Sequence, residues 1–386
     1  MRILLYTHTW APSVGGVETI TMSLAKGFAE WPQTHLGESV NVTLVTTTPA
    51  GAMDDSLLPF RVVRRPSVWN LAQLIRASDV LHVAGPAFLP MLLGFIFRKP
   101  TVVEHHGCQT ACPNGLLFYE PTQVPCPGHF MARRFHKCLE CNRTTQGLWK
   151  SPCMLLLAPL RRWLSNRASV NITPTNWLAG VLKLKRMKTI YHGISPDPDM
   201  KSRGQSISTF AFQGRLVSSK GVVVLLQAAE LLLAEGFDFH VKIIGDGPEL
   251  VRLKSAASEL RGRVEFLGHV PDDRLDELQG DACTIVMPSL GGEVFGLVTA
   301  ENMLRGKLVI VSDIGSLGEV VGDTGMVFRA GDAPALASCM RRVLEQPSIV
   351  TSLGSVARTR AMQVFRWDSM IQAHISIYRE ATRRLR

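Results

Sequence analysis

Short apolar runs alternate with longer segments of helical period along most of this chain. The run Arg2–Tyr6 is followed by a glycine pair and then by a helical pattern over about Glu18–Glu30. The next run, Val40–Thr46, is rich in β-branched residues, which favour strands. Strands that alternate with helices are typical of βαβ units, whose strands form a parallel sheet. We expect further strands of this series at 80–83, 100–104, 169–173 and 188–192.

A second alternating series begins at Thr209. The polar, proline-containing segment Ser195–Ser208 separates the two series and is typical of a linker. The pattern therefore predicts an α/β protein of two doubly wound domains, an N-terminal one over 1–195 and a C-terminal one over 209–365. A basic helix over 366–386 is expected to pack back on the N-terminal domain. Open α/β sheets bind ligands at the carboxyl ends of their strands, so two such domains suggest a site in a cleft.

The segment at about 107–153 interrupts the first series. It has no clean period and is rich in cysteine, proline, glycine and histidine, so we expect an inserted subdomain or a long ordered loop. Clustered cysteines in a cytosolic protein indicate metal or redox chemistry before structural disulfides. Six of the eight cysteines lie in this segment, namely Cys108, Cys112, Cys126, Cys138, Cys141 and Cys153.

Composition narrows the classes of partner and location. The 386 residues include 42 Lys+Arg against 32 Asp+Glu, a formal net charge of +10, which favours an anionic partner. Hydrophobic residues make up 46% of the chain, which excludes a disordered protein. The N-terminus shows no apolar run of a secretory leader, so a cytoplasmic protein is expected. The apolar stretch Phe88–Phe97 is expected to be a buried helix, with a surface helix that leans on a membrane as the alternative.

The segment Pro288–Glu301 carries the strongest chemical motif. It follows an apolar strand, contains a glycine pair and opens a helix. The free backbone N–H groups of Gly296, Leu297 and Val298 would then lie at a helix N-terminus, which binds anions. Glu301, inside that helix, could accept both hydroxyls of a ribose. For the two glutamates of the motif alone, an ordinary helix start with acids near it is the simpler interpretation.

Three further glycine turns follow expected strands. In Phe212–Gly221, Arg215 could bind a diphosphate in bidentate fashion and Lys220 as a point charge, or both could be solvated cations. Gly245–Glu249 has the proline and the acid of a plain helix start. The pair Gly15-Gly16 lets a ligand approach the backbone closely, although a two-glycine turn is weak support by itself.

In this order, the four motifs resemble the retaining glycosyltransferases of family 4. These have the GT-B fold, in which two Rossmann-like doubly wound domains face each other across a cleft. The resemblance covers nearly the whole chain, and its most specific part is Glu293 to Glu301 with Phe295-Gly296-Leu297 inside. Tyr191-His192-Gly193 stands where the family usually has Pro-Asn-Gly, which is a departure.

The resemblance implies a role for each matching residue. Arg215 and Lys220 contact the donor diphosphate together with Gly16, and Glu301 holds the ribose. Glu293 and the backbone at 295–297 line the transferred sugar. The implied catalytic residues are His106, Glu293, Arg215 and Lys220, with His105 as the alternative to His106. The implied donor-binding residues are Gly16, Gly214, Arg215, Lys220, Phe295, Gly296, Leu297 and Glu301.

The resemblance also implies the reaction. A sugar moves, with retention of configuration, from a UDP-, GDP- or ADP-linked donor to a saccharide or lipid-linked acceptor in polysaccharide or glycolipid biosynthesis. Arg215, Lys220 and the helix N-terminus would stabilise the leaving diphosphate, so no catalytic metal is expected. The sequence offers no carboxylate placed as a glycosidase nucleophile. Front-face attack, with a leaving phosphate oxygen as the base, is the family-level mechanism.

The cysteines depart from the family. Cys138 and Cys141 form a Cys-x2-Cys pair, which is half of a structural zinc site, and four ligands complete such a site. The expected zinc ligands are Cys112, Cys126, Cys138 and Cys141, with Cys108 as the substitute. An iron–sulfur cluster, disulfides and plain buried thiols are the alternatives. The segment begins directly after His106, so we expect it to border the acceptor side and to shape acceptor choice.

Four basic clusters would suit an anionic membrane surface, where each Lys or Arg adds about 1 kcal/mol. Each of them alone is more simply a solvated face. Together the clusters favour a cytoplasmic protein that binds peripherally to the inner face of the membrane. The clusters lie at 133–137, 161–163, 183–188 and 383–386.

Two other classes of function stay open. One is a nucleotide-sugar epimerase on the same fold, which an epimerised product would identify. The other is a non-enzymatic, zinc-bearing module that binds nucleic acid. The basic runs are dispersed and no known nucleic-acid motif is present, so no nucleic acid is expected as a partner.

Overall fold

The computed structural model describes residues 1–13, 15–34, 39–51, 53–194, 206–260, 262–271, 274–275 and 282–383. The chain divides into two compact units. Unit 1 comprises 1–115, 128–193 and 367–386, and unit 2 comprises 116–127 and 194–366. Most of the expected linker at 195–208 lies outside the described residues.

Unit 1 is built on a parallel sheet with the strand order β3-β2-β1-β4-β5-β8-β9. Its central strands are buried on both faces, which explains why they appear in the sequence as continuous apolar runs. In the register, Leu5 of β1 pairs with Leu44 of β2 and with His82 of β4. The strands are β1 (Arg2–Thr7), β2 (Asn41–Thr46), β3 (Arg61–Arg64), β4 (Val80–Ala84), β5 (Thr101–Glu104), β8 (Val170–Thr173) and β9 (Met187–Thr189).

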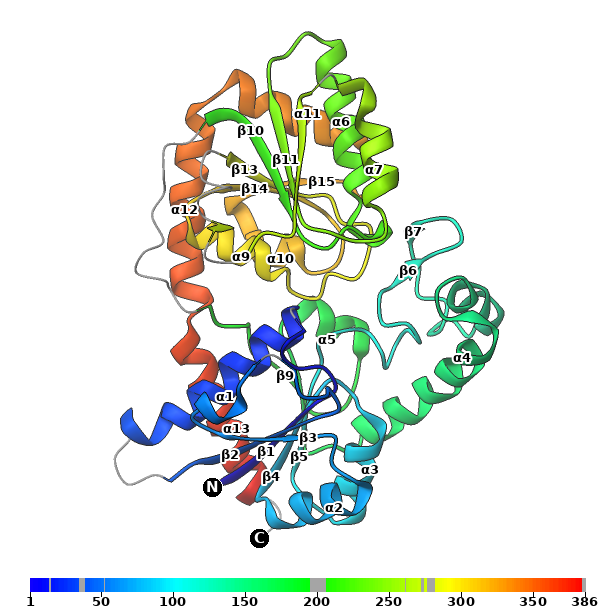
Figure 1. Ribbon diagram of the computed structural model, residues 1–386, viewed down its shortest axis with the longest axis vertical. Helices are drawn as coiled ribbons and strands as arrows, with labels where there is room; N and C mark the ends of the chain where they lie inside the picture. Colours follow the sequence, from blue (N-terminus) through cyan, green and yellow to red (C-terminus); the bar gives the residue numbers. More distant parts are fainter. Residues whose placement is uncertain are drawn as a thin grey trace. The chain divides into compact units, whose positions relative to one another are not determined.

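Helices pack on this sheet in two groups (Figure 1). Helix α13 contacts β4 and β5 and packs against α1. Helix α3 contacts the same two strands and packs against α2 and α4. The last helix is tied to the sheet by the Tyr378 hydroxyl, which lies 2.7 Å from His82 Nδ1 in β4. It is tied to α1 by Trp367 Nε1, which donates to Ser23 Oγ at 2.7 Å. The helices are α1 (Gly16–Thr34), α2 (Val68–Ala77), α3 (Phe88–Ile96), α4 (Phe135–Ser165), α5 (Asn176–Leu182) and α13 (Trp367–Arg383).

The apolar stretch expected to be a buried helix forms α3. Pro90, Met91 and Gly94 are buried against the sheet, while Phe95 and Ile96 at its end are exposed. Among the helices that the structure describes, none is both long enough and apolar enough to cross a membrane.

Unit 2 is built on a second parallel sheet with the order β12-β11-β10-β13-β14-β15. Its core includes the fully buried rings of Phe210, Phe212 and Phe239. Helix α6 packs against α11, and α12 packs against α9. The expected doubly wound α/β architecture is therefore confirmed in both units. The elements are β10 (Ser206–Gln213), α6 (Val222–Ala234), β11 (His240–Ile244), α7 (Leu250–Ala256), β12 (Val264–Gly268), β13 (Ala282–Met287), α9 (Leu297–Leu304), β14 (Leu308–Ser312), α10 (Leu317–Val321), β15 (Met326–Phe328), α11 (Ala333–Glu345) and α12 (Ser348–Val364).

A hairpin from the cysteine-rich segment belongs to unit 2, although it lies far from the rest of that unit in the sequence. Its strands are β6 (Phe118–Tyr119) and β7 (Val124–Pro125), which pair antiparallel. The Phe118 ring is fully buried in the core of unit 2. A Cβ on Gly291 would meet the Phe118 Cβ at 2.7 Å, so the hairpin backbone lies against this glycine.

The second half of the same segment is helical, which the sequence did not predict. Helix α4 runs from Phe135 to Ser165, with a break at Gly147, where φ is 79° and ψ is 178°. Pro152 and Pro159 lie inside the helix. These three residues disfavour helix locally and hid the helical period.

Candidate active site

The loops after β10 and β13 meet at the carboxyl edge of the sheet of unit 2. The backbone N–H groups of Leu290 and Gly291 donate to the carbonyl oxygen of Ser219, at 2.8 and 3.2 Å. Gly221 has a φ of 65°, and a Cβ there would meet the carbonyl oxygen of Pro288 at 2.0 Å. Only glycine suits both this conformation and this approach. The two strongest motifs of the sequence are therefore fixed against each other.

Lys220 and Glu293, two of the expected catalytic residues, form an ion pair through Glu293 Oε1. Ser289 Oγ donates to the same oxygen at 2.8 Å. The side chain of Glu293 is 7% exposed and that of Lys220 is 28% exposed. A buried carboxylate needs partners of this kind to offset its lost hydration. The arrangement holds one cation in a fixed, solvent-reachable position at the loop edge.

The loop after β14 holds the backbone of Glu293. The Ser316 N–H and hydroxyl donate to the Glu293 carbonyl oxygen at 3.1 and 3.3 Å. A Cβ on Gly315 would meet the same oxygen at 2.1 Å. In addition, Ser312 Oγ donates to the carbonyl oxygen of Ser289 at 2.6 Å. Sequence reasoning missed these residues, although their position directly after an apolar strand was the signal that identified the other motifs.

Helix α9 begins where the sequence predicted. Its N-cap is Gly296, with φ 80° and ψ 63°, and no side chain caps the helix. The first backbone N–H groups of α9 therefore have no acceptor within the helix, and the helix dipole adds partial positive charge. Glu301 lies within α9 and is half-buried. The ring of Phe295 is buried and packs edge-on against Phe365, so only the backbone of Phe295 is placed to contact a ligand.

Arg215 lies in the loop after β10 and is exposed. The N–H of Gly214 donates to Ile244 O at 2.9 Å, and the N–H of Leu216 donates to Asp246 O at 2.9 Å. These bonds fix the backbone on either side of Arg215 against the loop after β11. The motif at Gly245–Glu249, which the sequence analysis took as a plain helix start, thus supports the Arg215 loop.

Gly16 and His106 lie in unit 1, each a short distance after the end of a strand. Gly16 is the first residue of α1 and follows Gly15, whose carbonyl oxygen accepts from the Thr19 N–H and hydroxyl, both at 3.0 Å. His106 follows the end of β5. His105, the alternative, is fully buried, with Nε2 at 2.9 Å from Asn171 Oδ1. The geometry therefore gives His105 a packing role within the sheet.

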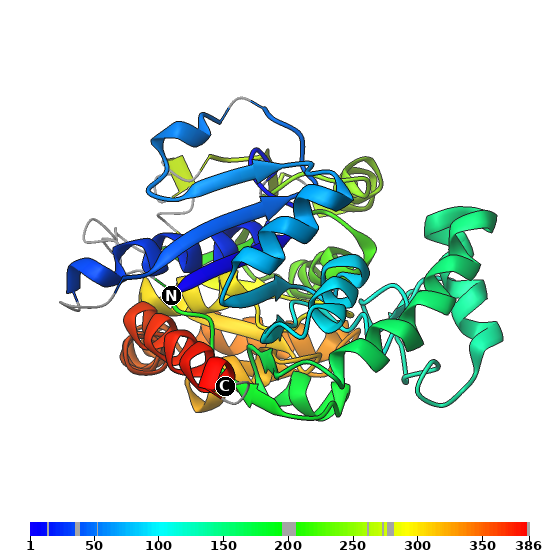
Figure 2. The ribbon, with the colours of Figure 1, turned by 90° about the horizontal axis from the view of Figure 1, so that it is seen from below.

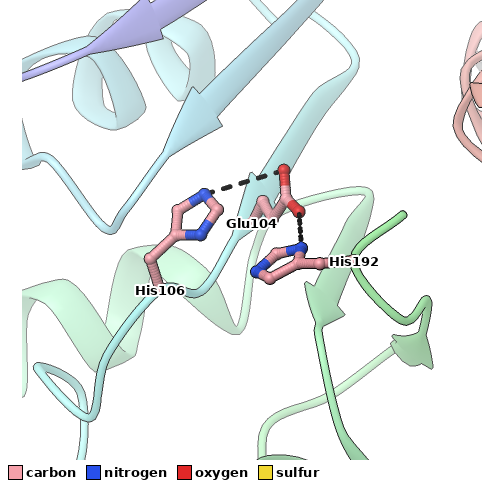
Figure 3. Close-up of side chains that lie close together, drawn as sticks. All are labelled: Glu104, His106 and His192. Atoms are coloured by element: carbon pink, nitrogen blue, oxygen red, sulfur yellow. Dashed lines mark ion pairs between the residues drawn. The ribbon is translucent and has the colours of Figure 1, made fainter. Parts of the chain in front are cut away.

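His106 belongs to a cluster of histidines around Glu104, the last residue of β5 (Figure 3). Its ring stacks on that of His192, with 5.4 Å between centroids and 22° between planes. Burial lowers the pKa of His106, and it lowers the pKa of His192 to about 3. Burial opposes ionisation of Glu104, but the surrounding histidines outweigh it and hold the pKa of this carboxyl well below its usual range. Sequence reasoning noted His192 only as a departure from the family and missed Glu104.

The expected zinc ligands are divided between the units. Cys112, Cys138 and Cys141 are buried in unit 1, whereas Cys126 is half-buried in unit 2. Cys112 Sγ donates to Asn114 Oδ1 at 2.9 Å, and Asn114 Nδ2 donates to Cys141 Sγ at 3.5 Å. Burial raises the pKa of the Cys108 thiol well above its ordinary value. Among the described residues, the one group of three ligand atoms close enough for a metal is Glu104, His106 and His192, and it contains no cysteine.

The structure thus brings most of the expected site residues to one edge of the sheet of unit 2. His106 and Gly16 lie in unit 1. The residues at the edge of unit 2 are Gly214, Arg215, Lys220, Glu293, Phe295, Gly296, Leu297 and Glu301. Their chemistry combines cations, free backbone N–H groups and carboxylates, which suits an anionic ligand that also carries hydroxyl groups.

Comparisons of sequence point to one family. The family model of glycosyl transferases group 1 matches residues 208–346. D-rhamnosyltransferase WbpZ of Pseudomonas aeruginosa is 32% identical over 400 residues, which cover 95% of this chain and 92% of that protein. Phosphatidyl-myo-inositol mannosyltransferase of Mycolicibacterium smegmatis is 30% identical over 241 residues. That match covers 60% of this chain and 61% of the mannosyltransferase, which is less than two thirds of its length.

Solved structures share the fold. Anabaena Alr3699/HepE in complex with UDP and glucose has a TM-score of 0.71 at 20% identity, covering 98% of this chain and 100% of that one. Sucrose-phosphate synthase from Thermosynechococcus elongatus has a TM-score of 0.72 at 19% identity, covering 98% of each chain. The expected GT-B fold is confirmed by these similarities.

Proposed function

This chain belongs to the glycosyl transferases group 1 family and is a glycosyltransferase, and we propose from this which reaction it catalyses and which residues take part. The proposed reaction moves a sugar, with retention of configuration, from a nucleotide-diphosphate sugar to a saccharide or lipid-linked acceptor in polysaccharide or glycolipid biosynthesis. The observation that carries the proposal is the Lys220–Glu293 pair, held between glycine loops at the edge where α9 begins.

The proposed mechanism separates two charges. As the bond between sugar and diphosphate breaks, negative charge develops on the diphosphate and positive charge on the sugar ring. Lys220, Arg215 and the N–H groups at the start of α9 stabilise the diphosphate, and such preorganised donors are most effective where they need not reorient. Glu301 holds the ribose, Gly16 approaches the diphosphate, and His106 faces the sugar.

Glu293 is proposed to line the sugar without attacking it. Its Oε1 already accepts from Lys220 and Ser289, which reduces its strength as a nucleophile. The acceptor hydroxyl then attacks the anomeric carbon from the face that the diphosphate leaves. Its proton passes to an oxygen of the leaving diphosphate, so neither a covalent sugar–enzyme intermediate nor a catalytic metal is needed.

Relatives support the choice of substrates. The solved complexes of Anabaena Alr3699/HepE contain UDP, with glucose or as UDP-glucose, which favours a UDP-linked donor over GDP- or ADP-linked ones. A relative named phosphatidyl-myo-inositol mannosyltransferase favours an acceptor attached to a lipid.

The donor is tested by thermal shift with UDP, GDP, ADP and their sugar conjugates, with and without EDTA. A ligand that binds only the folded protein stabilises it by about 2.7 kcal/mol at 100 times its Kd. We expect one nucleotide class to shift the melting temperature, with the same shift in EDTA. The Glu301→Ala variant should need at least ten times more donor for the same shift, because the ribose hydroxyls lose the carboxylate that accepts from them. A Glu301→Ala protein that binds the donor as the wild type does would contradict the assignment, and an epimerised free sugar would indicate an epimerase.

A structural zinc site of Cys112, Cys126, Cys138 and Cys141 stays a proposal from the sequence alone, because no three cysteines form a metal-binding group among the described residues. We expect the cobalt-substituted protein to show the charge-transfer absorption of thiolate ligands. Cys138→Ser with Cys141→Ser should remove this absorption and speed hydrogen exchange in α4. Cys339→Ser, in α11, serves as the control and should retain both properties. A wild-type protein without thiolate absorption would leave these residues as buried thiols.

Helix α4 supports the proposed association with an anionic membrane at the cytoplasmic face. It extends away from the strands of unit 1, in the cyan to green part of Figure 2. Beyond the break at Gly147 it exposes Leu148, Trp149, Leu156, Leu160 and Trp163, and Trp149 is 90% exposed. Lys150 is exposed among them, and Arg143 is exposed just before the break. Exposed apolar and aromatic side chains next to cations are typical of surfaces that insert into anionic lipid headgroups.

Trp149→Ala is expected to weaken binding to anionic lipid vesicles about tenfold, because a Trp side chain contributes a large apolar area at the interface. Co-sedimentation with vesicles of phosphatidylglycerol and phosphatidylcholine measures this. Trp69 in α2 is also largely exposed, so Trp69→Ala is the matched control and should bind as the wild type does. An equal loss of vesicle binding in the two variants would contradict α4 as the membrane contact. Binding that does not depend on the charge of the vesicles would contradict it as well.

A further inference from the structure

Glu104 is a buried carboxylate with an unusual set of neighbours. It is fully buried at the end of β5, and neither of its oxygens accepts a hydrogen bond. Its ion-pair partners are four histidines, and no lysine or arginine pairs with it in the described part of the chain. A buried charge without a hydrogen bond or a permanent counter-ion is costly. Within the described residues, the carboxylate of Glu104 is therefore surrounded by imidazole nitrogens and not by a permanent cation.

The four histidines approach Glu104 from different elements of unit 1. Nε2 of His82, in β4, lies 3.1 Å from Oε2, and Nε2 of His374, in α13, lies 3.6 Å from it. His106 Nε2 lies 3.7 Å from Oε2, and His192 Nδ1 lies 3.7 Å from Oε1. Three other segments of unit 1 thus converge on the end of β5, which itself carries both Glu104 and His106.

Three of these groups form a set that suits a metal ion. One ligand atom from each of Glu104, His106 and His192 lies within 4.8 Å of the other two. Figure 3 shows both rings with a nitrogen directed at the carboxylate. Zinc bonds to histidine nitrogen and carboxylate oxygen are about 2.0–2.2 Å long, so ligand atoms around tetrahedral zinc lie about 3.4 Å apart. The nitrogens of His106 and His192 lie 3.7 Å from Oε2 and Oε1, respectively, and all three ligand atoms lie within 4.8 Å of one another. Side-chain rotations that shorten these separations by about 1 Å or less would reach the spacing of tetrahedral zinc.

We propose that Glu104, His106 and His192 form a binding site for a divalent transition-metal ion, with zinc as the best match. Two imidazoles and one carboxylate are a known ligand set for zinc, with the fourth position left to water or a substrate group. The ion would place a permanent positive charge beside this fully buried carboxylate.

His82 and His374 complete the site as supporting residues. The Nε2 atoms of both rings lie next to Glu104 Oε2, at 3.1 and 3.6 Å. The Tyr378 hydroxyl lies 2.7 Å from the other ring nitrogen of His82. Metal-ligating groups are commonly oriented by such outer contacts, whose loss weakens metal affinity about 10- to 100-fold. The sugar transfer proposed above requires no ion, so this site is a separate property that shares His106 with it.

The test is cobalt and zinc binding to the metal-free protein of residues 1–386 without donor or acceptor, which makes the result independent of the proposed sugar transfer. In addition to any cobalt held by the thiols, we expect one cobalt ion per chain whose visible absorption lacks the thiolate charge-transfer band. In Cys138→Ser with Cys141→Ser this ion should remain, which separates its site from the cysteines. Zinc should displace it at one equivalent. His192→Gln should weaken this binding by at least tenfold, whereas His240→Gln, an exposed residue of unit 2, should leave it unchanged.

Two results would overturn the proposal. One is a wild-type protein that takes up no cobalt or zinc outside its thiols, which needs no variant and so does not depend on how the variants fold. It would mean that a protonated histidine balances Glu104. The other is a folded His192→Gln protein, shown by an unchanged melting temperature without metal, that binds cobalt as tightly as the wild type.

Discussion

The Lys220→Ala variant is expected to lose about 10²- to 10³-fold in kcat for sugar transfer, the usual effect of removing one preorganised donor to a transition-state charge. Glu293 holds Lys220 Nζ in place, at the position where the diphosphate is proposed to leave. Arg215 and the start of α9 remain to bind the donor, so KM should rise less than kcat falls. Initial rates at saturating acceptor, with the donor found by thermal shift, measure both constants.

The control must separate catalysis from folding. Removing Lys220 leaves Glu293 buried with one partner fewer, so Lys220→Ala should also lower the melting temperature. Lys220→Ala with Glu293→Gln removes both charges and should restore stability but not activity. Lys254, an exposed residue of α7, gives the matched control Lys254→Ala, which should retain both. Wild-type kcat in Lys220→Ala would refute the assigned site.

Phe118→Ala is expected to lower the free energy of unfolding of unit 2 by about 3–5 kcal/mol, the usual cost of truncating a buried phenylalanine. The expected loss is large because this ring is fully buried in the core of unit 2, although the hairpin that carries it comes from the cysteine-rich segment. The site should loosen as well, since the hairpin backbone lies against Gly291.

Native-state hydrogen exchange of peptides from β10 to β13 measures the effect of Phe118→Ala. All seven tryptophans lie in unit 1, so tryptophan fluorescence in urea reports on the other unit and should shift much less. Val124→Ala changes an exposed residue of the same hairpin and should stay within about 0.5 kcal/mol of the wild type. If the free energy of unfolding fell more by tryptophan fluorescence than by hydrogen exchange in unit 2, Phe118 would be shown to stabilise unit 1.

The sequence predicted the sheets and the glycine loops because these depend on local signals. Buried parallel strands are continuous apolar runs, and the loop after such a strand lies at the ligand edge of the sheet. That reasoning was enough to bring Lys220 and Glu293 to the same edge, although 73 positions separate them. It also placed the start of α9, because Gly296 precedes a helical pattern directly.

Other features depend on long-range packing and gave no local signal. Nothing near Phe118 indicates that its ring enters the core of unit 2. Glu104 ends a buried strand, but the approach of His374 from the last helix cannot be inferred from spacing in the sequence. In α4, a glycine and two prolines concealed a helix that tertiary contacts with α3 stabilise.

The route of the chain has a consequence for how such proteins recombine. The chain passes between the two units four times, because residues 116–127 belong to unit 2. A gene exchange with one crossover at the linker would transfer residues 194–386, which include the last helix of unit 1 but not the hairpin of unit 2. The recipient's own hairpin would then have to fit a foreign Gly291 loop. A chimaera that takes residues 116–127 together with 194–366 should therefore fold where one with a single junction at the linker fails.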